Sequence, residues 1–142
     1  MSAATNDMKP AGAPAIQTRT RIALCAAVIV LGLALRGFGL GLGLPAGIVK
    51  YGGSVLWATM VFLLVVIACP RLRGRNAALV SIAIAIGVEL FRLVHTPWLD
   101  AFRLTLPGAL LLGRIFSSWN MLAYGVGILF GMLVDRLTHS AS

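Results

Sequence analysis

Two charged side chains in the middle of an apolar helical run constrain this chain most. The run AALVSIAIAIGVELFRLV at positions 77–94 carries Glu89 and Arg92 on one helical face. Three stretches of similar hydrophobicity surround it, at 22–40, 54–69 and 121–137. About 20 apolar residues span the hydrocarbon core of a bilayer, so the chain is predicted to cross a membrane several times. Charges inside such helices are costly and usually serve a site or a partner helix.

The composition predicts an all-α, polytopic membrane helix bundle with one domain. The chain has 142 residues, of which 59% are hydrophobic and 11% charged, whereas a soluble domain carries about 25% charged residues. Residues 1–18 are rich in Ala, Pro, Thr and Gly and are expected to form a disordered tail, with a single transmembrane domain at 19–142. Arg19 and Arg21 imitate the start of a signal peptide, but no small-x-small cleavage site follows, so the first span should be retained.

Four transmembrane helices are expected, over about 22–40, 54–69, 77–95 and 121–137. Pro97 should end the third, because the residue before a proline avoids the helical region. The apolar segment 104–116 would cover only about 20 Å as a helix, too short for a core of ~30 Å. It is predicted to be a short re-entrant or interfacial helix, with a fifth full span as the alternative. Gly127 and Gly131 have the GxxxG spacing that permits close helix approach.

The orientation follows from the basic turn between the second and third spans. Arg71, Arg73 and Arg75 lie within five residues, and the positive-inside rule places such a turn in the cytoplasm. Four crossings then place both termini in the cytoplasm.

The charged residues of the expected outer half should lie in one layer. Measured along straight helices from the cytoplasmic side, Glu89 lies about 18 Å deep and Arg36 and Arg92 about 21–22 Å deep. Glu89 and Arg92 are spaced i and i+3, so they can pair on one helix, and Arg36 could reach Glu89 from the first span. Asp100 and Arg103 have the same spacing and predict a second pair. The alternative is that these charges only clamp helices together.

Basic residues dominate the outer end. Arg36, Lys50, Arg92, Arg103 and Arg114 outnumber Glu89 and Asp100 there. An anionic group such as a phosphate, pyrophosphate or carboxylate would fit this cationic mouth, and membrane lipid headgroups are its nearest supply. Tyr51, Trp98 and Trp119 are expected to be interfacial anchors.

Other classes of function receive less support. The formal net charge is +8, but the basic residues lie between membrane segments and no basic stripe with exposed aromatics indicates nucleic-acid binding. Two His and two Cys have no metal-ligand spacing, and no cofactor is expected. No nucleophile–base pair or converging carboxylates indicate catalytic residues.

Three blocks of the sequence resemble a known family. The blocks are LPAGIVKYGGSVLWATMVF, VELFRLVHTPWLDAFRLTLPGALLLG and WNMLAYGVGILFG, and the family is the bacterial membrane family called domain of unknown function 2809. The resemblance covers nearly all of 30–137, and PWLDAFR is its most specific part. It implies a multi-pass protein of the bacterial inner membrane, and because the family has no established activity it implies little about function.

A fainter resemblance is to VanZ-like proteins, through the positions Glu89 to Arg92 and Asn120 to Gly127. It implies a link to the cell envelope. The chain departs from the family pattern at three positions. Ser54 stands where Asp is usual, Arg92 where Gln is usual and Asn120 where Asp is usual, which makes the predicted pocket more cationic.

Several functions remain open at this point. The leading hypothesis is a binding or accessory protein that holds an anionic lipid headgroup or a cell-envelope precursor at its outer mouth. The first alternative is a protomer of a small transporter or channel. Four short spans enclose little volume, so it would require a homo-oligomer. The second alternative is a structural helix bundle without a ligand.

Overall fold

The computed structural model describes residues 13–72, 74–112 and 117–140, and within these ranges all regular structure is α-helical. The helices are α1 (Ala13–Phe38), α2 (Ala46–Ala68), α3 (Arg75–Phe91), α4 (Pro97–Arg103), α5 (Leu106–Leu111) and α6 (Ser118–Ser140). The predicted all-α class therefore holds for the described part of the chain.

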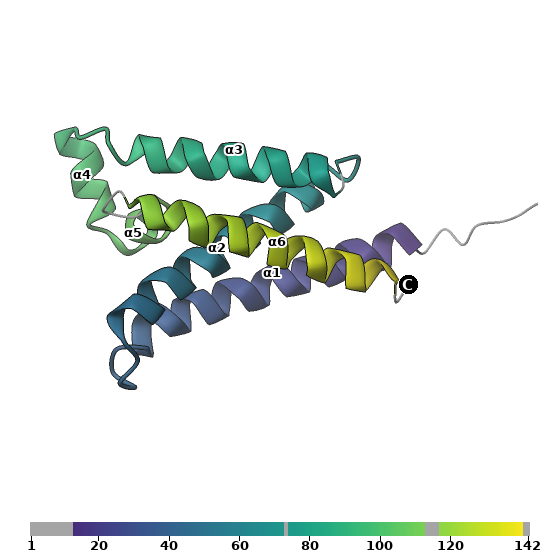
Figure 1. Cartoon of the computed structure of the whole chain (residues 1–142), viewed down its shortest axis with the longest axis horizontal. Helices are drawn as coiled ribbons and strands as arrows, with labels where there is room; N and C mark the ends of the chain where they lie inside the picture. Colours follow the sequence, from purple (N-terminus) through teal and green to yellow (C-terminus); the bar gives the residue numbers. More distant parts are fainter. Residues whose placement is uncertain (1–12, 73, 113–116, 141–142) are drawn as a thin grey trace, which may run out of the picture.

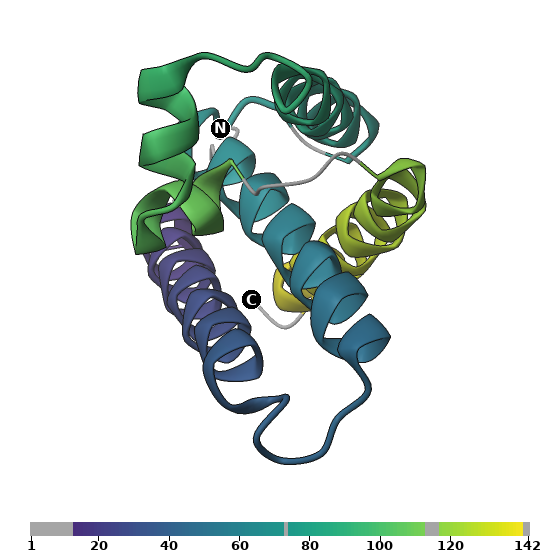
Figure 2. The ribbon, with the colours of Figure 1, turned by 90° about the vertical axis from the view of Figure 1, so that its left-hand side faces the viewer.

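Four long helices run along the bundle, and the short helices α4 and α5 lie at one end of it (Figure 1). The loop between α1 and α2 lies at that same end. The start of α1, the turn between α2 and α3, and the end of α6 lie at the opposite end. Helix α2 is central, because it contacts α1, α3 and α6 (Figure 2).

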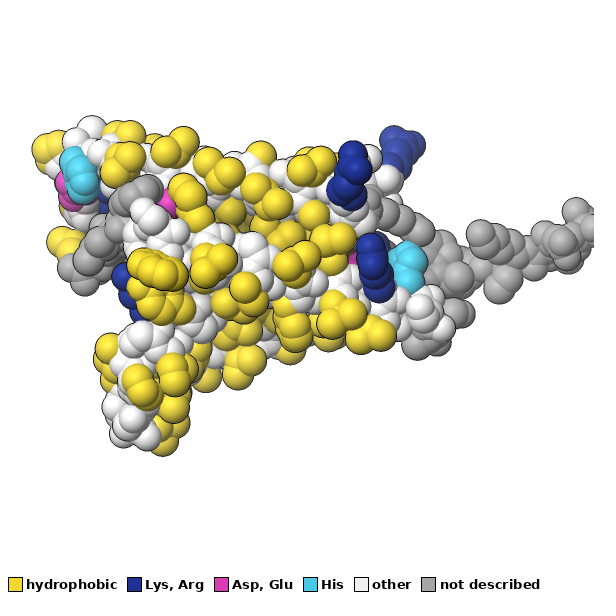
Figure 3. All heavy atoms as spheres, viewed as in Figure 1, with side chains coloured by type: hydrophobic (Ala, Val, Ile, Leu, Met, Phe, Trp, Pro, Cys, Tyr) yellow, Lys and Arg dark blue, Asp and Glu magenta, His cyan; other side chains and the backbone are white. Residues whose placement is uncertain are grey.

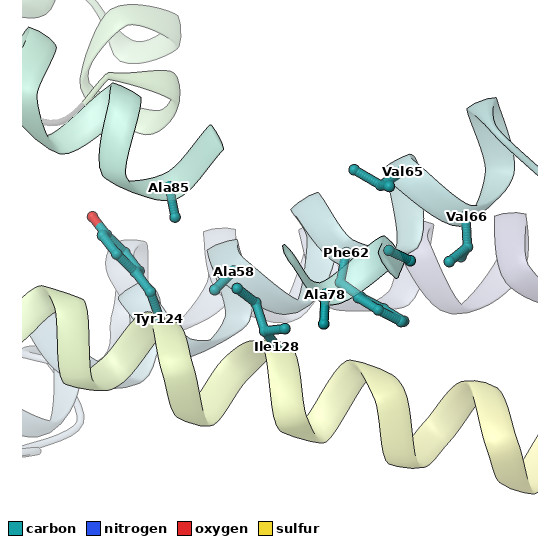
Figure 4. Packing of buried hydrophobic residues seen from close by; sticks show 9 residues of the cluster. Ala58, Phe62, Val65, Val66, Ala78, Ala85, Tyr124 and Ile128 are labelled. Atoms are coloured by element: carbon teal, nitrogen blue, oxygen red, sulfur yellow. The ribbon is translucent and has the colours of Figure 1, made fainter. Parts of the chain in front are cut away.

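Small and branched apolar residues form the core between α2, α3 and α6. Ala58, Phe62 and Val66 recur every fourth residue along one face of α2, as expected for a helix that buries one stripe. They pack with side chains of α3 and α6, among them Ala85 and Ile128 (Figure 4).

Two glycines of α6 allow it to approach α2 closely. A Cβ atom at Gly127 would overlap the carbonyl oxygen of Val55, and one at Gly131 would lie 2.8 Å from Cδ1 of Phe62. The hydroxyl of Thr59 donates to the Gly127 carbonyl over 2.9 Å. The close helix approach that the GxxxG spacing permits is therefore present.

Three helices are long and apolar enough to cross a membrane: Ala15–Phe38, Ala46–Ala68 and Ser118–Ser140. Many of their large apolar side chains point outward, such as Leu31, Leu64 and Leu129, which are 58%, 46% and 66% exposed. On the face in Figure 3, hydrophobic side chains cover the middle and charged ones gather toward the two ends. This pattern is compatible with a multi-pass membrane protein. Helix α3 has 17 residues and covers about 25 Å.

The first two helices begin earlier than predicted. Helix α1 starts at Ala13, inside the segment expected to be a disordered tail, whereas residues 1–12 lie outside the described residues. Its start is rich in Ala, and Pro14 stands in the first turn, where proline is tolerated. Helix α2 starts directly after Pro45, so the segment before 54, expected to lie outside the span, is its first two turns.

The third helix ends earlier than predicted. It stops at Phe91 rather than about His95, and Thr96, directly before Pro97, is extended with φ −134° and ψ 147°. Pro97 does not directly follow the end of α3 but is the first residue of α4. Helix α4 was not predicted from the sequence.

The half-helix expected over about 104–116 is only partly described. Its described part contains only α5, six residues long, and residues 113–116 lie outside the described residues. The side chain of Thr105 caps α5 by accepting from the Gly108 N–H over 3.2 Å. Gly108 also allows the chain to fold back, because a Cβ there would overlap the carbonyl oxygen of Phe102.

Candidate functional site

Glu89 is the centre of a buried polar cluster between α3 and α6. Its side chain has no exposed surface and its Oε2 lies 2.6 Å from Nη1 of Arg92. The hydroxyl of Tyr124 donates to the same oxygen over 2.8 Å. The backbone N–H of Ser117 and the amide of Asn120 donate to Oε1 over 2.8 and 3.4 Å. We call these five residues the Glu89 cluster.

Helical spacing explains how the cluster forms. Arg92 follows Glu89 by three residues, so both side chains lie on one face, and their predicted pairing is confirmed. Asn120 and Tyr124 are one turn apart on the face of α6 that contacts α3. The hydroxyl of Ser54 in α2 lies 3.3 Å from Oδ1 of Asn120, which connects a third helix to the cluster. Ser54, Asn120 and Arg92 therefore lie in one connected set of contacts with Glu89.

Arg36 lies near this cluster but does not bind Glu89. Its Nη1 donates to the carbonyl of Ala109 over 3.0 Å. The Nε of Arg92 donates to the carbonyl of Leu112 over 2.5 Å. Both guanidinium groups thus bind carbonyls at the end of α5, where a helix has no internal donors left.

A pocket of about 320 Å³ lies between α1, α2, α5 and α6. This is at the lower end of the volume usual for small-molecule sites, about 300–1,000 Å³. Its walls are mainly apolar, and Arg36 and Arg92 are its two charged lining residues. The remaining lining residues are Val28, Ile29, Gly32, Leu33, Gly53, Ser54, Leu56, Trp57, Met60, Pro107, Ala109 and Tyr124.

Because α1 and α2 pair along their length, the pocket has a charged end and an apolar end. A Cβ at Gly53 would lie 3.8 Å from Nε of Arg36, and one at Gly32 would lie 3.9 Å from Cβ of Leu56. The two helices therefore run antiparallel with Arg36 opposite Gly53. The lining residue of α1 farthest from Arg36 is Val28, eight positions away, so the apolar part of the pocket extends about 12 Å along α1.

Two other predicted anion-binding residues, Arg103 and Lys50, lie outside the lining of this pocket. Arg103 is 3% exposed. Its guanidinium donates to the carbonyls of Val94 and Phe91 over 2.9 and 2.7 Å and to Asp100 over 3.1 Å. The predicted Asp100–Arg103 pair is thus present, and Arg103 binds the carbonyls that follow or end α3.

Lys50 and His95 also lie outside the pocket lining. The ammonium of Lys50 lies 5.1 Å from the centre of the Tyr51 ring. His95 is within 3.3 Å of the Asp100 carboxylate. Arg114 lies outside the described residues. Of the five predicted anion-binding residues, the structure brings Arg36 and Arg92 together at one pocket.

The predicted interfacial aromatics are partly exposed. Trp98 and Trp119 are 70% and 68% exposed, and both lie near the α4–α5 end, in α4 and at the start of α6. Tyr51 is of intermediate exposure, in the first turns of α2.

The sequence reading missed a second buried ion pair, at the opposite end of the bundle. Arg21 of α1 binds Asp135 of α6 through two contacts of 2.7 and 3.1 Å, and Arg21 is 3% exposed. One turn further out, Gln17 lies 2.7 Å from the ring of His139. The sequence offered one indication of this pair. Arg21 lies near the start of α1 and Asp135 near the end of α6, and these two helix ends lie at the same end of the bundle.

Glu89 and Arg36 differ in how much of their hydrogen-bonding capacity is used by the described residues. All described donors around Glu89 are directed at its two oxygens, so it neither faces the pocket as a free base nor lacks partners. Arg36, by contrast, has one hydrogen bond to the described residues, while a guanidinium carries five N–H donors. No group of three His, Cys, Asp or Glu side chains in the described ranges could hold a metal ion.

A match to a known family covers α2 to α5 and the first half of α6. No solved structure matches the chain. The model of the family described as "Protein of unknown function (DUF2809)" matches residues 43–128. The match contains the whole Glu89 cluster but not α1 with Arg36. Since it covers more than half of the 142 residues, the chain belongs to the DUF2809 family.

Proposed function

We propose that this protein crosses the bacterial inner membrane four times, with both termini in the cytoplasm. Three helices have the required length and apolarity. Helices α2 and α6 both end at the same end of the bundle, whereas α6 begins at the opposite end (Figure 1). Between them the chain therefore returns along the bundle through α3, which supplies the fourth crossing. Arg71, Arg73 and Arg75 beside this turn support its cytoplasmic location.

In this orientation the pocket opens toward the outer half of the bilayer, and its function is to bind an anionic group there. The observation that carries the proposal is the lining of the pocket by two guanidinium groups within otherwise mainly apolar walls. Small-molecule sites commonly have this composition, with few polar groups that orient the ligand. A phosphate or carboxylate is favoured, because the planar guanidinium can bind either in a bidentate manner.

The two arginines would contribute differently. Arg92 is oriented in advance by Glu89 and the Leu112 carbonyl, so little freedom is lost when a ligand binds. Arg36 is exposed and makes one bond to Ala109, so it can turn toward a ligand without leaving a buried charge unpaired. The protein is then a binding or accessory protein for an anionic headgroup or a cell-envelope precursor.

Native mass spectrometry from a gentle detergent tests this function. Arg36→Gln should reduce the retained anionic lipid about tenfold, because one contact to a charged group contributes about 1.5–3 kcal/mol. Lys50→Gln is the matched control, since it removes the same charge near the same end of the bundle but does not line the pocket.

Equal retention in Arg36→Gln and the wild type, at equal folded yield, would remove the proposal and leave a structural helix bundle. The same spectra report stoichiometry. A single sharp oligomer would instead favour the protomer of a transporter.

A further inference from the structure

We infer that the ligand is a membrane lipid whose apolar chain occupies the part of the pocket between α1 and α2, with its anionic group at Arg36 and Arg92. This inference rests on the proposed function and adds the class of ligand. A free anion such as inorganic phosphate would need only the charged end of the pocket.

The pocket has an apolar end that a free anion would not use. From Arg36 the lining runs along α1 through Leu33 and Ile29 to Val28, and along α2 to Met60. Because α1 and α2 are antiparallel, Val28 and Met60 lie together at the end far from the guanidinium groups. This end is near the middle of both membrane helices, where hydrocarbon and not water surrounds the protein.

Two glycines line the pocket without being required for helix packing: Gly53 lies opposite Arg36, and Gly32 lies one turn along α1 toward the apolar end. A Cβ at Gly32 or Gly53 would make only ordinary contacts, at 3.9 and 3.8 Å. By contrast, a Cβ at Gly127 would overlap backbone of α2. Since Gly32 and Gly53 both line the pocket, larger side chains there would take up pocket volume while the contact between α1 and α2 is retained.

A lipid can reach this pocket directly from the bilayer. The outward side chains of α1 beside it are apolar, with Leu31 and Leu33 58% and 41% exposed. An amphipathic ligand satisfies both ends of the pocket at once, because burial of its chain is favourable and its anionic group meets the excess of positive charge.

The fluorescence of Trp57 can report on the acyl chain of a bound lipid, because Trp57 lines the pocket. The protein has three Trp, so Trp98→Phe with Trp119→Phe leaves Trp57 as the single tryptophan, which can be excited selectively over the tyrosines. This protein would be placed in nanodiscs of zwitterionic lipid with a small fraction of phosphatidylglycerol brominated in its acyl chains. Brominated phosphatidylcholine at the same fraction measures quenching by non-specific contact.

The expected result is stronger quenching of Trp57 by the brominated anionic lipid than by the brominated zwitterionic lipid. This difference should be lost in Gly32→Leu, which fills the apolar part of the pocket, and in Arg36→Gln. It should persist in Gly87→Leu, since Gly87 has no atom within 4 Å of an added Cβ. If Gly32→Leu does not fold, the smaller Gly32→Val replaces it at the same position.

Two failures can be distinguished. If the two brominated lipids quench equally while Arg36-dependent retention of anion persists in mass spectrometry, the lipid-chain inference is overturned and the headgroup site stands. Competition by water-soluble glycerol phosphate alone would lead to the same conclusion. If neither measurement depends on Arg36, the proposed function itself fails.

Discussion

Glu89 illustrates how a carboxylate can be accommodated inside an apolar helix. It is completely buried, and a side-chain cation, a hydroxyl, an amide and a backbone N–H all donate to it. A buried charge is tolerated only when it is paired and its remaining lone pairs are satisfied. The cluster therefore joins α3 to α6 and at the same time orients Arg92 at the pocket.

Replacing Glu89 by Ala should destabilise the protein strongly. The change strands the Arg92 guanidinium, which is 9% exposed, and loss of one partner of a buried pair costs about 3–5 kcal/mol. Part of this loss should be recovered in Glu89→Ala with Arg92→Leu, because no unpaired charge then remains. Thermal unfolding of the purified protein in detergent measures both effects.

Asp100→Asn is the matched control for this prediction. Its carboxylate also pairs with an arginine at i+3 but is 45% exposed. The buried Arg103 guanidinium keeps the carbonyls of Val94 and Phe91 as acceptors, so Asp100→Asn should destabilise the protein less than Glu89→Ala. Wild-type stability of Glu89→Ala would contradict the central role of this carboxylate in the fold.

At the scale of elements, the close contact between α2 and α6 depends on glycines, which have no side chain to hold the two helices apart. Gly127 and Gly131 bring α6 against Val55 and Phe62, and Thr59 adds a hydrogen bond across the contact. Without a hydrophobic driving force inside lipid, such close van der Waals packing is a main source of helix association.

Gly127→Ala should therefore destabilise the bundle, although alanine normally stabilises a helix by about 0.5–1 kcal/mol relative to glycine. The added methyl group would overlap the backbone of α2, and such overpacking costs about 1–3 kcal/mol. Gly125→Ala is the control, because an added Cβ there has no atom within 4 Å. The prediction is wrong if the two variants unfold at the same temperature.

At the scale of the whole molecule, each end of the bundle has its own buried ion pair. Arg21 with Asp135 joins α1 to α6 at the end that holds the start of α1 and the end of α6. Arg92 with Glu89 acts at the end that holds α4 and α5. Between them the helices present mainly apolar side chains outward (Figure 3), so the long axis of the bundle is expected to follow the membrane normal.

The proposed topology predicts opposite labelling of two exposed positions. In a protein without Cys25 and Cys69, a cysteine replacing Gly47 should react with an impermeant reagent in intact cells. A cysteine replacing Asn76, beside the basic turn, should react only after lysis. Both residues are exposed, and Asn76 is preferable to Gly74, whose φ of 53° favours glycine. The reverse pattern would invert the bundle and contradict the outer location of the pocket.

The local features of the fold could be predicted from the sequence where a short-range rule applied. The pair Glu89–Arg92 follows from i, i+3 spacing, and the small residues of α6 follow from the GxxxG pattern. Helix ends were predicted less well. Proline stops a helix that precedes it but also begins one, and Pro97 does the latter in α4.

Hydrophobicity and charge along the chain determined by themselves that this protein is a helical bundle with apolar outer faces and polar ends. Only the tertiary structure decided which partners the charged side chains find on other helices. It turns Arg36 to the Ala109 carbonyl, buries Arg103 against the end of α3 and joins Arg21 to Asp135, 114 positions away. The physical reason is that contacts between helices depend on their register and rotation. Packing of the whole bundle sets both, and no single segment encodes them.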